Sequence, residues 1–366
     1  MNGRPHHENH RVPARSAGTA GTHRRSNVIP DPAVTPAEKV AFLESPDSYP
    51  DATTPVQTVE THRSWVFLTE RHAYKLKKPG LYPFLDASTV AARKYLCEEE
   101  LRLNKRLAGE VYIAVVPLTA GRASRLELEG TGLIVDWLVK MQRLPAASML
   151  DAKIRRHELP EEGICRTAQK LAHFYQGSPP LGITAAEYRF ALECGISANR
   201  DELIRPIFGL HDDLVRAVCT IQLKFLTRAL PLFEHRTCHG RVVEAHGDLR
   251  PEHVCLLDPE PVIIDCLEFS FQLRTLDAAS ELAFLDQECE RLDAPRVGEI
   301  IFDIYREITR DRPTPPLLNF YKSYWACLRA KLCAWHLTDS SCREPDKWSR
   351  RASDYLRRAE CYASSI

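Results

Sequence analysis

The sequence HGDLRPEHV at residues 246–254, with the segment that follows it, decides the predicted fold. Two apolar runs, at 254–257 and 262–264, are joined by the compact turn sequence DPEP, which predicts a buried β-hairpin. Asp265 ends the second run, seventeen residues after Asp248. The hairpin would therefore return a second carboxylate to the loop that carries the first.

Two converging carboxylates suit phosphoryl transfer. One acid orients the attacking hydroxyl and accepts its proton, and the other holds Mg²⁺ on the nucleotide phosphates. Taken singly, Asp248 also fits a turn cap after a glycine, and Asp265 fits a strand-end cap. A Lys-rich strand and an acidic helix earlier in the chain favour the catalytic interpretation of the pair.

The first half of the chain predicts a small sheet with one helix. Apolar and β-branched runs predict strands at 56–59, 65–68, 72–76, 111–117 and 133–141, the second and third of which form a hairpin. Helical spacing predicts a helix over 90–107 with Tyr95, Leu96, Leu103 and Leu107 on one apolar face. A capping Thr-Pro-Ala-Glu sequence at 35–38 predicts a short helix that runs to residue 43.

Beyond Pro145 the helical signals dominate. Helices are predicted at 161–175, from 184 onward behind a Thr-x-x-Glu cap, at 212–230, at 320–337 and at 347–358. In the third of these, the residues in register for the apolar face are Leu214, Val218, Ile221 and Phe225. A sheet-rich half is thus followed by a helical half.

HGDLRPEH resembles the catalytic loop of the protein-kinase-like superfamily, and HGD before an apolar hairpin ending in Asp resembles its aminoglycoside phosphotransferase branch. ETHRSWVFL, AYKLKKP, CEEELRLNKRLAGEVY and IIDCLEF resemble a bacterial group of that branch, and the likeness covers about residues 36–340. It implies an α+β, protein-kinase-like, two-lobed fold. The expected division is a disordered tail (1–34), a β-rich nucleotide-binding N-lobe (35–143) and a mostly helical C-lobe (144–366) that carries the catalytic loop.

The resemblance also implies roles for four residues. Asp248 takes the catalytic position and Asp265 the metal-binding position. Lys75 resembles the lysine that reaches the α/β-phosphates, and Glu100 resembles the carboxylate that holds this lysine. The pattern leaves alternatives open, because alternation puts Lys75 and Lys77 on one strand face. The residues that compete for these two positions are Lys77, Lys78, Glu98 and Glu99.

Three departures from the family pattern bear on activity. His253 stands where the family has an asparagine that binds the second metal ion, so we expect an imidazole ligand there. The turn expected to cover the phosphates, at 60–64, has no glycine, and Ser64 or Arg63 would contact the phosphates instead. The metal-site sequence at 265–267 reads DCL.

Other positions have weaker assignments. The segment 139–142 would join the lobes and present backbone near Met141 to adenine, or it is a plain strand exit. Arg250 would lie near the transferred phosphoryl group, or it bridges the loop to Glu252. Asp277 resembles a later Asp of the family, which we expect to support the catalytic loop.

Composition limits the classes of function. Lys+Arg and Asp+Glu both number 49, so no net charge draws the protein to nucleic acid or anionic lipid. No apolar run is long enough for a spanning helix and the first residues lack a secretory signal, so we expect no membrane contact and a cytoplasmic protein. The twelve scattered cysteines include no CxxC pair and are expected to be reduced thiols, with Cys97, Cys219, Cys255 and Cys327 in apolar segments.

The sequence therefore predicts an ATP-dependent, Mg²⁺-using phosphotransferase, for which Mn²⁺ would also serve, acting on a hydroxyl of a small molecule. An alternative is a nucleotide-binding regulatory protein that has lost catalysis. A nucleic-acid module that uses the basic tail and the C-terminal arginines is disfavoured. The acidic residues Asp286, Glu288, Glu290 and Asp293 would attract a cationic substrate or, as we expect, form a solvated helix face.

Overall fold

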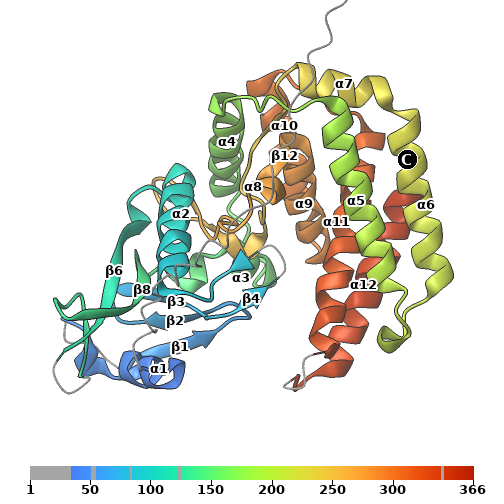
Figure 1. Ribbon diagram of the computed structural model, residues 1–366. Coiled ribbons are helices and arrows are strands. Elements are labelled where there is room, and N and C mark those ends of the chain that lie inside the picture. The colour runs from blue at the N-terminus through green and yellow to red at the C-terminus, as the bar shows by residue number, and fades with distance from the viewer. Residues whose placement is uncertain (1–33, 51–54, 83–84, 122–124, 339–341) are drawn as a thin grey trace, which may run out of the picture.

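The computed structural model describes residues 34–50, 55–82, 85–121, 125–338 and 342–366. These residues form a sheet-rich N-lobe, from α1 to β8, and a helical C-lobe, from α3 onward (Figure 1). Apart from Val34, the tail predicted at 1–34 lies outside the described residues.

The N-lobe is built on a six-stranded antiparallel sheet with the strand order β1-β2-β3-β8-β6-β7. Its strands are β1 (Gln57–Glu60), β2 (Ser64–Leu68), β3 (His72–Lys77), β6 (Tyr112–Ala120), β7 (Leu126–Leu128) and β8 (Leu133–Gln142). The predicted strands are confirmed, and β2 and β3 form the predicted hairpin with Val66 opposite Lys75. The short pair β4 (Leu81–Tyr82) and β5 (Leu85–Asp86) and the edge strand β7 were not predicted.

Two helices lie on opposite faces of this sheet. Helix α1 (Pro36–Glu44) begins with the predicted capping box, and its buried Leu43 packs with Tyr74 and Leu76 of β3. Helix α2 (Val90–Ala108) packs on β6 and β8. Alternation along β3 therefore turns the intervening lysines towards α2.

The predicted apolar face of α2 is only partly correct. Leu96, Leu103 and Leu107 are buried, but Tyr95 is 62% exposed. The buried side also carries Glu100, which no hydrophobic pattern would select. Tyr95 is exposed because the face of α2 that packs on the sheet is partly polar. That face is rotated about the helix axis from the face that apolar spacing predicted.

The C-lobe is an assembly of helices around one core. Its helices are α3 (Leu150–Arg155), α4 (Glu161–Gly177), α5 (Ala185–Leu203), α6 (Asp212–Arg228), α7 (Leu230–Cys238), α8 (Phe271–Arg274), α9 (Ala278–Arg291), α10 (Pro295–Thr309), α11 (Pro315–Trp335) and α12 (Pro345–Ala363). The predicted register of α6 is only partly correct. Val218 is buried as predicted, and Leu214 and Phe225 pack partly buried against the core, but Ile221 is 37% exposed. The other buried residues are Val215, Cys219, Gln222 and Leu226, because α6 packs on α5 through a face displaced from the predicted one.

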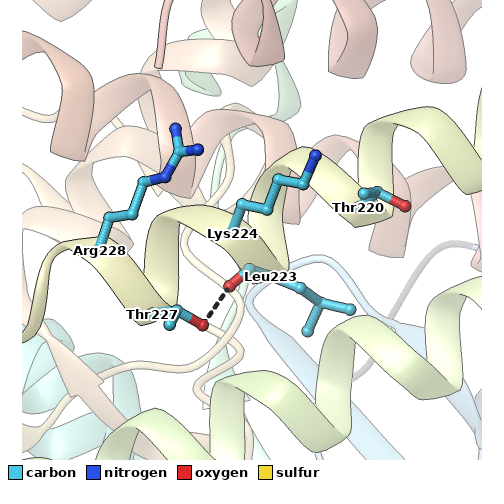
Figure 2. A pocket seen from close by; sticks show the side chains of 5 residues that line it. All are labelled: Thr220, Leu223, Lys224, Thr227 and Arg228. Atoms are coloured by element: carbon cyan, nitrogen blue, oxygen red, sulfur yellow. Dashed lines mark hydrogen bonds between the residues drawn. The ribbon is translucent and has the colours of Figure 1, made fainter.

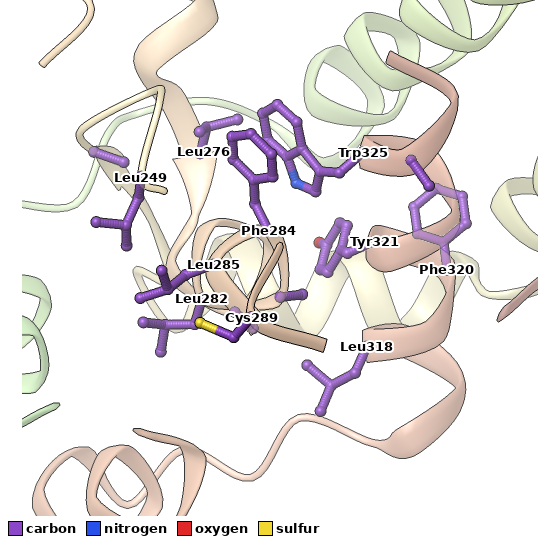
Figure 3. Close-up of a cluster of buried hydrophobic side chains, with 14 of the residues drawn as sticks. Leu249, Leu276, Leu282, Phe284, Leu285, Cys289, Leu318, Phe320, Tyr321 and Trp325 are labelled. Atoms are coloured by element: carbon purple, nitrogen blue, oxygen red, sulfur yellow. The ribbon is translucent and has the colours of Figure 1, made fainter. Parts of the chain in front are cut away.

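Helix α9 lies at the centre of this core. Phe284 stacks on Trp325 of α11 with ring centroids 4.4 Å apart, and Leu249 from the loop at 246–254 packs into the same cluster (Figure 3). The expectation of a solvated acidic face is wrong for Asp286 and Glu288, which are buried and paired with basic side chains of α9 and α11. Asp293, just after the helix, is exposed.

Small strand pairs hold the segments between these helices. The predicted hairpin is confirmed, with β10 (Val254–Cys255) antiparallel to β11 (Val262–Ile263). Strand β9 (Val242–Glu244), just before the loop at 246–254, pairs with β12 (Thr275–Asp277). Each of the twelve cysteines is a free thiol, and the four named above are buried. Within the described ranges, no helix combines the length and apolar character that crossing a bilayer requires.

Candidate active site

Two lysines of β3 and one glutamate of α2 form the N-lobe part of the site. Nζ of Lys75 lies 2.8 Å from Oε1 of Glu100, and Lys77 contacts the other oxygen of the same carboxylate. Glu100 is fully buried at 0% exposure. The other three competing residues form ion pairs elsewhere: Lys78 with Glu60, Glu98 with Lys94, and Glu99 with Arg102. The structure thus brings Glu100 to both Lys75 and Lys77.

Lys75 also reaches the metal-site aspartate. Its Nζ lies 2.6 Å from Oδ1 of Asp265, whose side chain is 42% exposed. Asp265 has the left-handed φ of 63°, and its backbone N–H donates to the hydroxyl of Tyr112 over 3.1 Å. Burial acts to raise the pKa of Asp265, but the charge of Lys75 and its hydrogen bond outweigh it and hold that pKa well below the ordinary range. Asp265 is therefore a carboxylate anion.

Sequence reasoning missed several residues that join the lobes here. Glu268 contacts Lys77, so each lysine of β3 pairs with one acid of the segment after β11. Asn104 accepts a hydrogen bond of 2.9 Å from the backbone N–H of Cys266, and Arg106 donates to the carbonyl oxygens of Glu244 and Ala245 at 2.8 and 2.9 Å. Asn104 follows Glu100 by one helical turn, and that spacing is the signal that could have identified it.

Helix α9 packs against the loop at 246–254 and supports its backbone. Gly247 has φ of 88°, and a Cβ there would meet Leu267 at 3.0 Å, so glycine is required. The buried carboxylate of Glu281 accepts hydrogen bonds from the backbone N–H groups of His246 and Gly247 and from the hydroxyl of Tyr175. Together with the buried Leu249, these bonds fix the backbone on both sides of Asp248.

Glu281 supports the catalytic loop, a role that the sequence had predicted for Asp277. Asp277 accepts two hydrogen bonds from Arg236, one of 2.9 Å from the hydroxyl of Tyr321, and caps the start of α9. It therefore ties α7 and α11 to α9, and its partners lie outside the loop at 246–254. The two acids are separated by one turn of α9, which explains why the motif alone chose the wrong one.

Arg250 holds the carboxylate of Asp248. Its Nε and Nη2 atoms donate to Oδ1 and Oδ2 of Asp248 at 2.9 and 3.0 Å. The contact with Glu252 is longer, at 3.9 Å, so the bridge considered from the sequence is secondary. Burial acts to raise the pKa of Asp248, but the charges of Arg250 and Arg329 outweigh it and the pKa is lowered.

His253 lies between the two aspartates. Its Nε2 is 3.5 Å from Oδ2 of Asp265 and its Nδ1 is 3.7 Å from Oδ2 of Asp248. Nδ1 is also 2.8 Å from the carbonyl oxygen of Asp248, and Nη2 of Arg250 is 3.0 Å from Nε2. The carbonyl only accepts and the guanidinium only donates, so the imidazole is neutral with its proton on Nδ1.

This geometry separates the two predicted metal ligands. Asp265 fits a magnesium ligand, because it offers an exposed, anionic, hard oxygen donor. His253 does not fit in this arrangement, because its one lone pair faces a guanidinium. Within the described ranges, no group of three His, Cys, Asp or Glu side chains is arranged to hold an ion unaided.

The other two predicted nucleotide contacts lie in the N-lobe sheet. Ser64 is buried at the start of β2, opposite Lys77, with its backbone bonded to the hydroxyl of Thr61 at the β1–β2 turn. Met141 is in β8 next to its end, is 8% exposed, and pairs with Ala73 of β3. Both residues border the sheet region that carries Lys75.

One surface pocket lies apart from this site. It follows one face of α6, where Thr220, Leu223, Lys224, Thr227 and Arg228 line a volume of about 280 Å³ (Figure 2). The hydroxyl of Thr227 bonds to the carbonyl oxygen of Leu223, within the same helix. None of the predicted site residues lines it.

Comparison with known sequences yields only uncharacterised relatives. No protein-family model matches the chain. Uncharacterised proteins of Mycobacterium tuberculosis and Mycobacterium bovis are 29% identical over an alignment of 297 residues that covers 78% of this chain and 56% of theirs. The chain therefore spans about half the length of the curated relatives it matches.

Comparison with solved structures is more specific about fold. A choline/ethanolamine kinase family protein from Mesorhizobium loti matches with a TM-score of 0.53 and 14% identity, covering 90% of this chain and 99% of that one. The GDP complex of an aminoglycoside 2′-phosphotransferase mutant matches with the same TM-score and identity, covering 89% and 97%. Both are small-molecule kinases by name. The chain therefore has the two-lobed, protein-kinase-like fold of the aminoglycoside phosphotransferases and the choline/ethanolamine kinases.

Proposed function

We propose that this protein is an ATP-dependent phosphotransferase that moves the γ-phosphoryl group to a hydroxyl of a small molecule. The observation that carries the proposal is the contact between Lys75 and Asp265, which joins the two lobes at 2.6 Å. Asp248 belongs to the same constellation, because His253 lies between it and Asp265. Nucleotides in solved structures of this fold, such as GDP, add support for a nucleotide ligand.

Each residue of the constellation has a role in this proposal. Lys75, held by the buried Glu100, binds the α- and β-phosphates as a fixed point charge. Asp248 orients the acceptor hydroxyl and takes its proton as the oxygen attacks, and its lowered pKa keeps it ionised for that task. Mg²⁺ bound at Asp265 would neutralise charge on the nucleotide phosphates.

Arg250 has two tasks in this mechanism. In the free protein it satisfies the carboxylate of Asp248. Its guanidinium would turn from Asp248 to the γ-phosphoryl oxygens when the nucleotide binds, since a carboxylate and a phosphoryl group each offer a pair of oxygen acceptors to a guanidinium. That exchange would release Asp248 to accept a hydrogen bond from the acceptor hydroxyl.

Two substitutions test the proposal. Asp248→Asn should lower turnover by about 10²–10⁴-fold while ADP still binds, because it removes only the proton acceptor. Asp265→Ala should abolish the part of ADP affinity that depends on Mg²⁺. The matched control is Asp258→Asn, an exposed aspartate of the β10–β11 turn that pairs with Arg166. Product formation is measured by ADP release in a screen of hydroxylated amines and sugars, and unchanged turnover in Asp248→Asn would contradict the proposal.

A second candidate is a nucleotide-binding regulatory protein without catalysis. The contact of Arg250 with Nε2 of His253 favours it, since this contact occupies the position where relatives in the resembled family bind a second metal ion. Such a protein would bind ATP tightly with Mg²⁺ or Mn²⁺ and release no ADP with any acceptor. ADP release that disappears in Asp248→Asn would exclude this candidate.

A further inference from the structure

A pocket lined by arginines lies at the end of α9. Arg291 from the last turn of that helix and Arg351, Asp354, Arg357, Arg358 and Cys361 of α12 enclose a volume of about 410 Å³. Helices α9, α11 and α12 pack together in this part of the C-lobe (Figure 1). We call this volume the arginine pocket. It is large enough for a phosphorylated or carboxylated small molecule.

The positive charges of the arginine pocket are only partly neutralised from within the protein. Arg357 pairs with Asp354, its one acidic lining residue. Among the described residues, neither Arg351 nor Arg358 forms an ion pair with a carboxylate. Arg351 lies over the ring of Trp348 at 5.9 Å, and Arg358 lies near the hydroxyl of Tyr362. Two guanidinium groups are therefore available to an anion.

Arg291 links the arginine pocket to the catalytic loop. Its side chain is 14% exposed, its Nη2 is buried without a hydrogen bond, and that atom lies 3.8 Å from Oε1 of Glu252. Its Nε donates to Glu288 over 3.1 Å, and Glu288 also pairs with Arg329 at 3.3 Å. Glu252 belongs to the loop that carries Asp248. The arginine pocket thus adjoins the acceptor side of the candidate active site.

The acids around this region do not leave a site for a cation. Glu252 faces Arg250 and Arg291, while Glu288 faces Arg291 and Arg329. Each carboxylate thus has two arginines near it. A polycationic acceptor would meet uncompensated guanidinium groups in the arginine pocket and would be repelled, since like charges close together in a partly buried site are costly.

We infer that the arginine pocket binds an anionic group of the acceptor, so that the substrate is a hydroxyl compound carrying a phosphate or carboxylate. The assignment of the anion to the acceptor rests on the proposed function. The anion site itself is inferred from the arginines alone. Planar guanidinium groups bind both of these anions with paired hydrogen bonds. The hydroxyl would then extend past Arg291 towards Asp248.

Calorimetric titration of the full chain tests the anion site. The probes are glucose 6-phosphate and galacturonate, each compared with its neutral parent sugar, and choline serves as the cationic probe. We expect at least one anionic probe to bind about tenfold or more tightly than its parent sugar and than choline. The two probes distinguish a phosphate from a carboxylate as the preferred group.

Charge reversal in the arginine pocket provides the matched comparison. The double variant Arg351→Glu with Arg358→Glu should lose at least tenfold in affinity for the bound anion. Arg350→Glu, an exposed arginine of the same helix outside the lining, should change it less than twofold. Equal loss in both variants, an unchanged affinity in the double variant, tighter binding of choline, or no binding of either anionic probe would overturn the inference.

A second titration distinguishes this inference from the proposed function. ADP affinity should be unchanged in the double variant, and anion affinity should be unchanged in Lys75→Met. If ADP does not bind the native protein but the anion binds and is lost in the double variant, the anion site stands and the phosphotransferase proposal fails. If anion binding is lost in Lys75→Met, the probe occupies the nucleotide site and the inference is wrong.

Discussion

Nη2 of Arg250 lies 3.0 Å from Nε2 of His253 and occupies the only lone pair that this imidazole offers. The same guanidinium atom is 3.0 Å from Oδ2 of Asp248. One side chain therefore controls both the candidate proton acceptor and the position where the resembled family has its second metal ligand. Movement of Arg250 would change metal binding and acid–base chemistry together.

Removal of this guanidinium should expose His253 to metal ions. In Arg250→Ala we expect Mn²⁺ to strengthen ADP binding about tenfold more than it does in the native protein, because a free imidazole adds a nitrogen ligand, which Mn²⁺ accepts more readily than Mg²⁺ does. Fluorescent-nucleotide titrations in Mn²⁺, Mg²⁺ and chelator measure the effect. Arg250→Lys is the control, since it keeps a cation near Asp248. The same metal dependence in all three proteins would rule out His253 as a latent ligand.

Lys75 and Lys78 provide a matched pair for the nucleotide site. Lys75→Met should weaken ADP binding about tenfold or more, because it removes the cation that bridges Glu100 and Asp265. The variant should stay folded, since Lys77 still neutralises Glu100. Lys78→Met removes a pair with the exposed Glu60 and a contact with the ring of Trp65, both away from Glu100 and Asp265, and should bind ADP normally. Equal affinities in the two variants would show that Lys75 does not contact the phosphates.

Glu281 should contribute to stability through the loop that it supports. Glu281→Ala leaves three buried donors without an acceptor, so we expect the free energy of unfolding to fall by about 2–4 kcal/mol. Burial raises the pKa of Glu281, so Glu281→Gln, which is neutral and keeps one acceptor oxygen, should lose about half as much. Urea unfolding measures both, with the exposed Glu299→Ala as control. A loss below about 1 kcal/mol in Glu281→Ala would contradict the assigned role.

His246 should make stability depend on pH. Its Nε2–H donates to the carbonyl oxygen of Ile264 over 2.9 Å, and its Nδ1 accepts from the backbone N–H of Asp248 over 3.3 Å. Burial lowers the pKa of His246 from 6.5 to about 3. The unfolded chain therefore binds a proton below pH 6.5 that the folded chain does not bind.

The sign follows from this difference. Stability from His246 is complete above pH 6.5 and is lost as the pH falls towards about 3, with a slope of up to about 1.4 kcal/mol per pH unit. Urea unfolding between about pH 6.5 and 4.5 isolates this group from the aspartates, which titrate lower. In His246→Gln the slope should decrease by about one proton. An identical slope in the two proteins would mean that His246 is protonated in the folded state.

The sequence was sufficient for the local elements that carry the site. Caps, turns and strand alternation act over a few residues, so the capping box at Thr35, the β2–β3 hairpin and the hairpin between Asp248 and Asp265 were all predicted correctly. Alternation also correctly put Lys75 and Lys77 on one face. It could not choose between them, because both side chains leave the strand in the same direction.

Only the tertiary structure decided which charges meet. The pairing of Lys77 with Glu268 depends on how β3 lies against the segment after β11, and the support of the catalytic loop by Glu281 in place of Asp277 depends on how α9 lies against that loop. From the sequence, the acids of α9 were predicted to form a solvated face. The helix is buried, however, and its Asp286 and Glu288 are paired with lysine and arginine. A local sequence pattern cannot predict these pairs, because a charged side chain is tolerated inside a protein only where a distant segment places an oppositely charged side chain beside it.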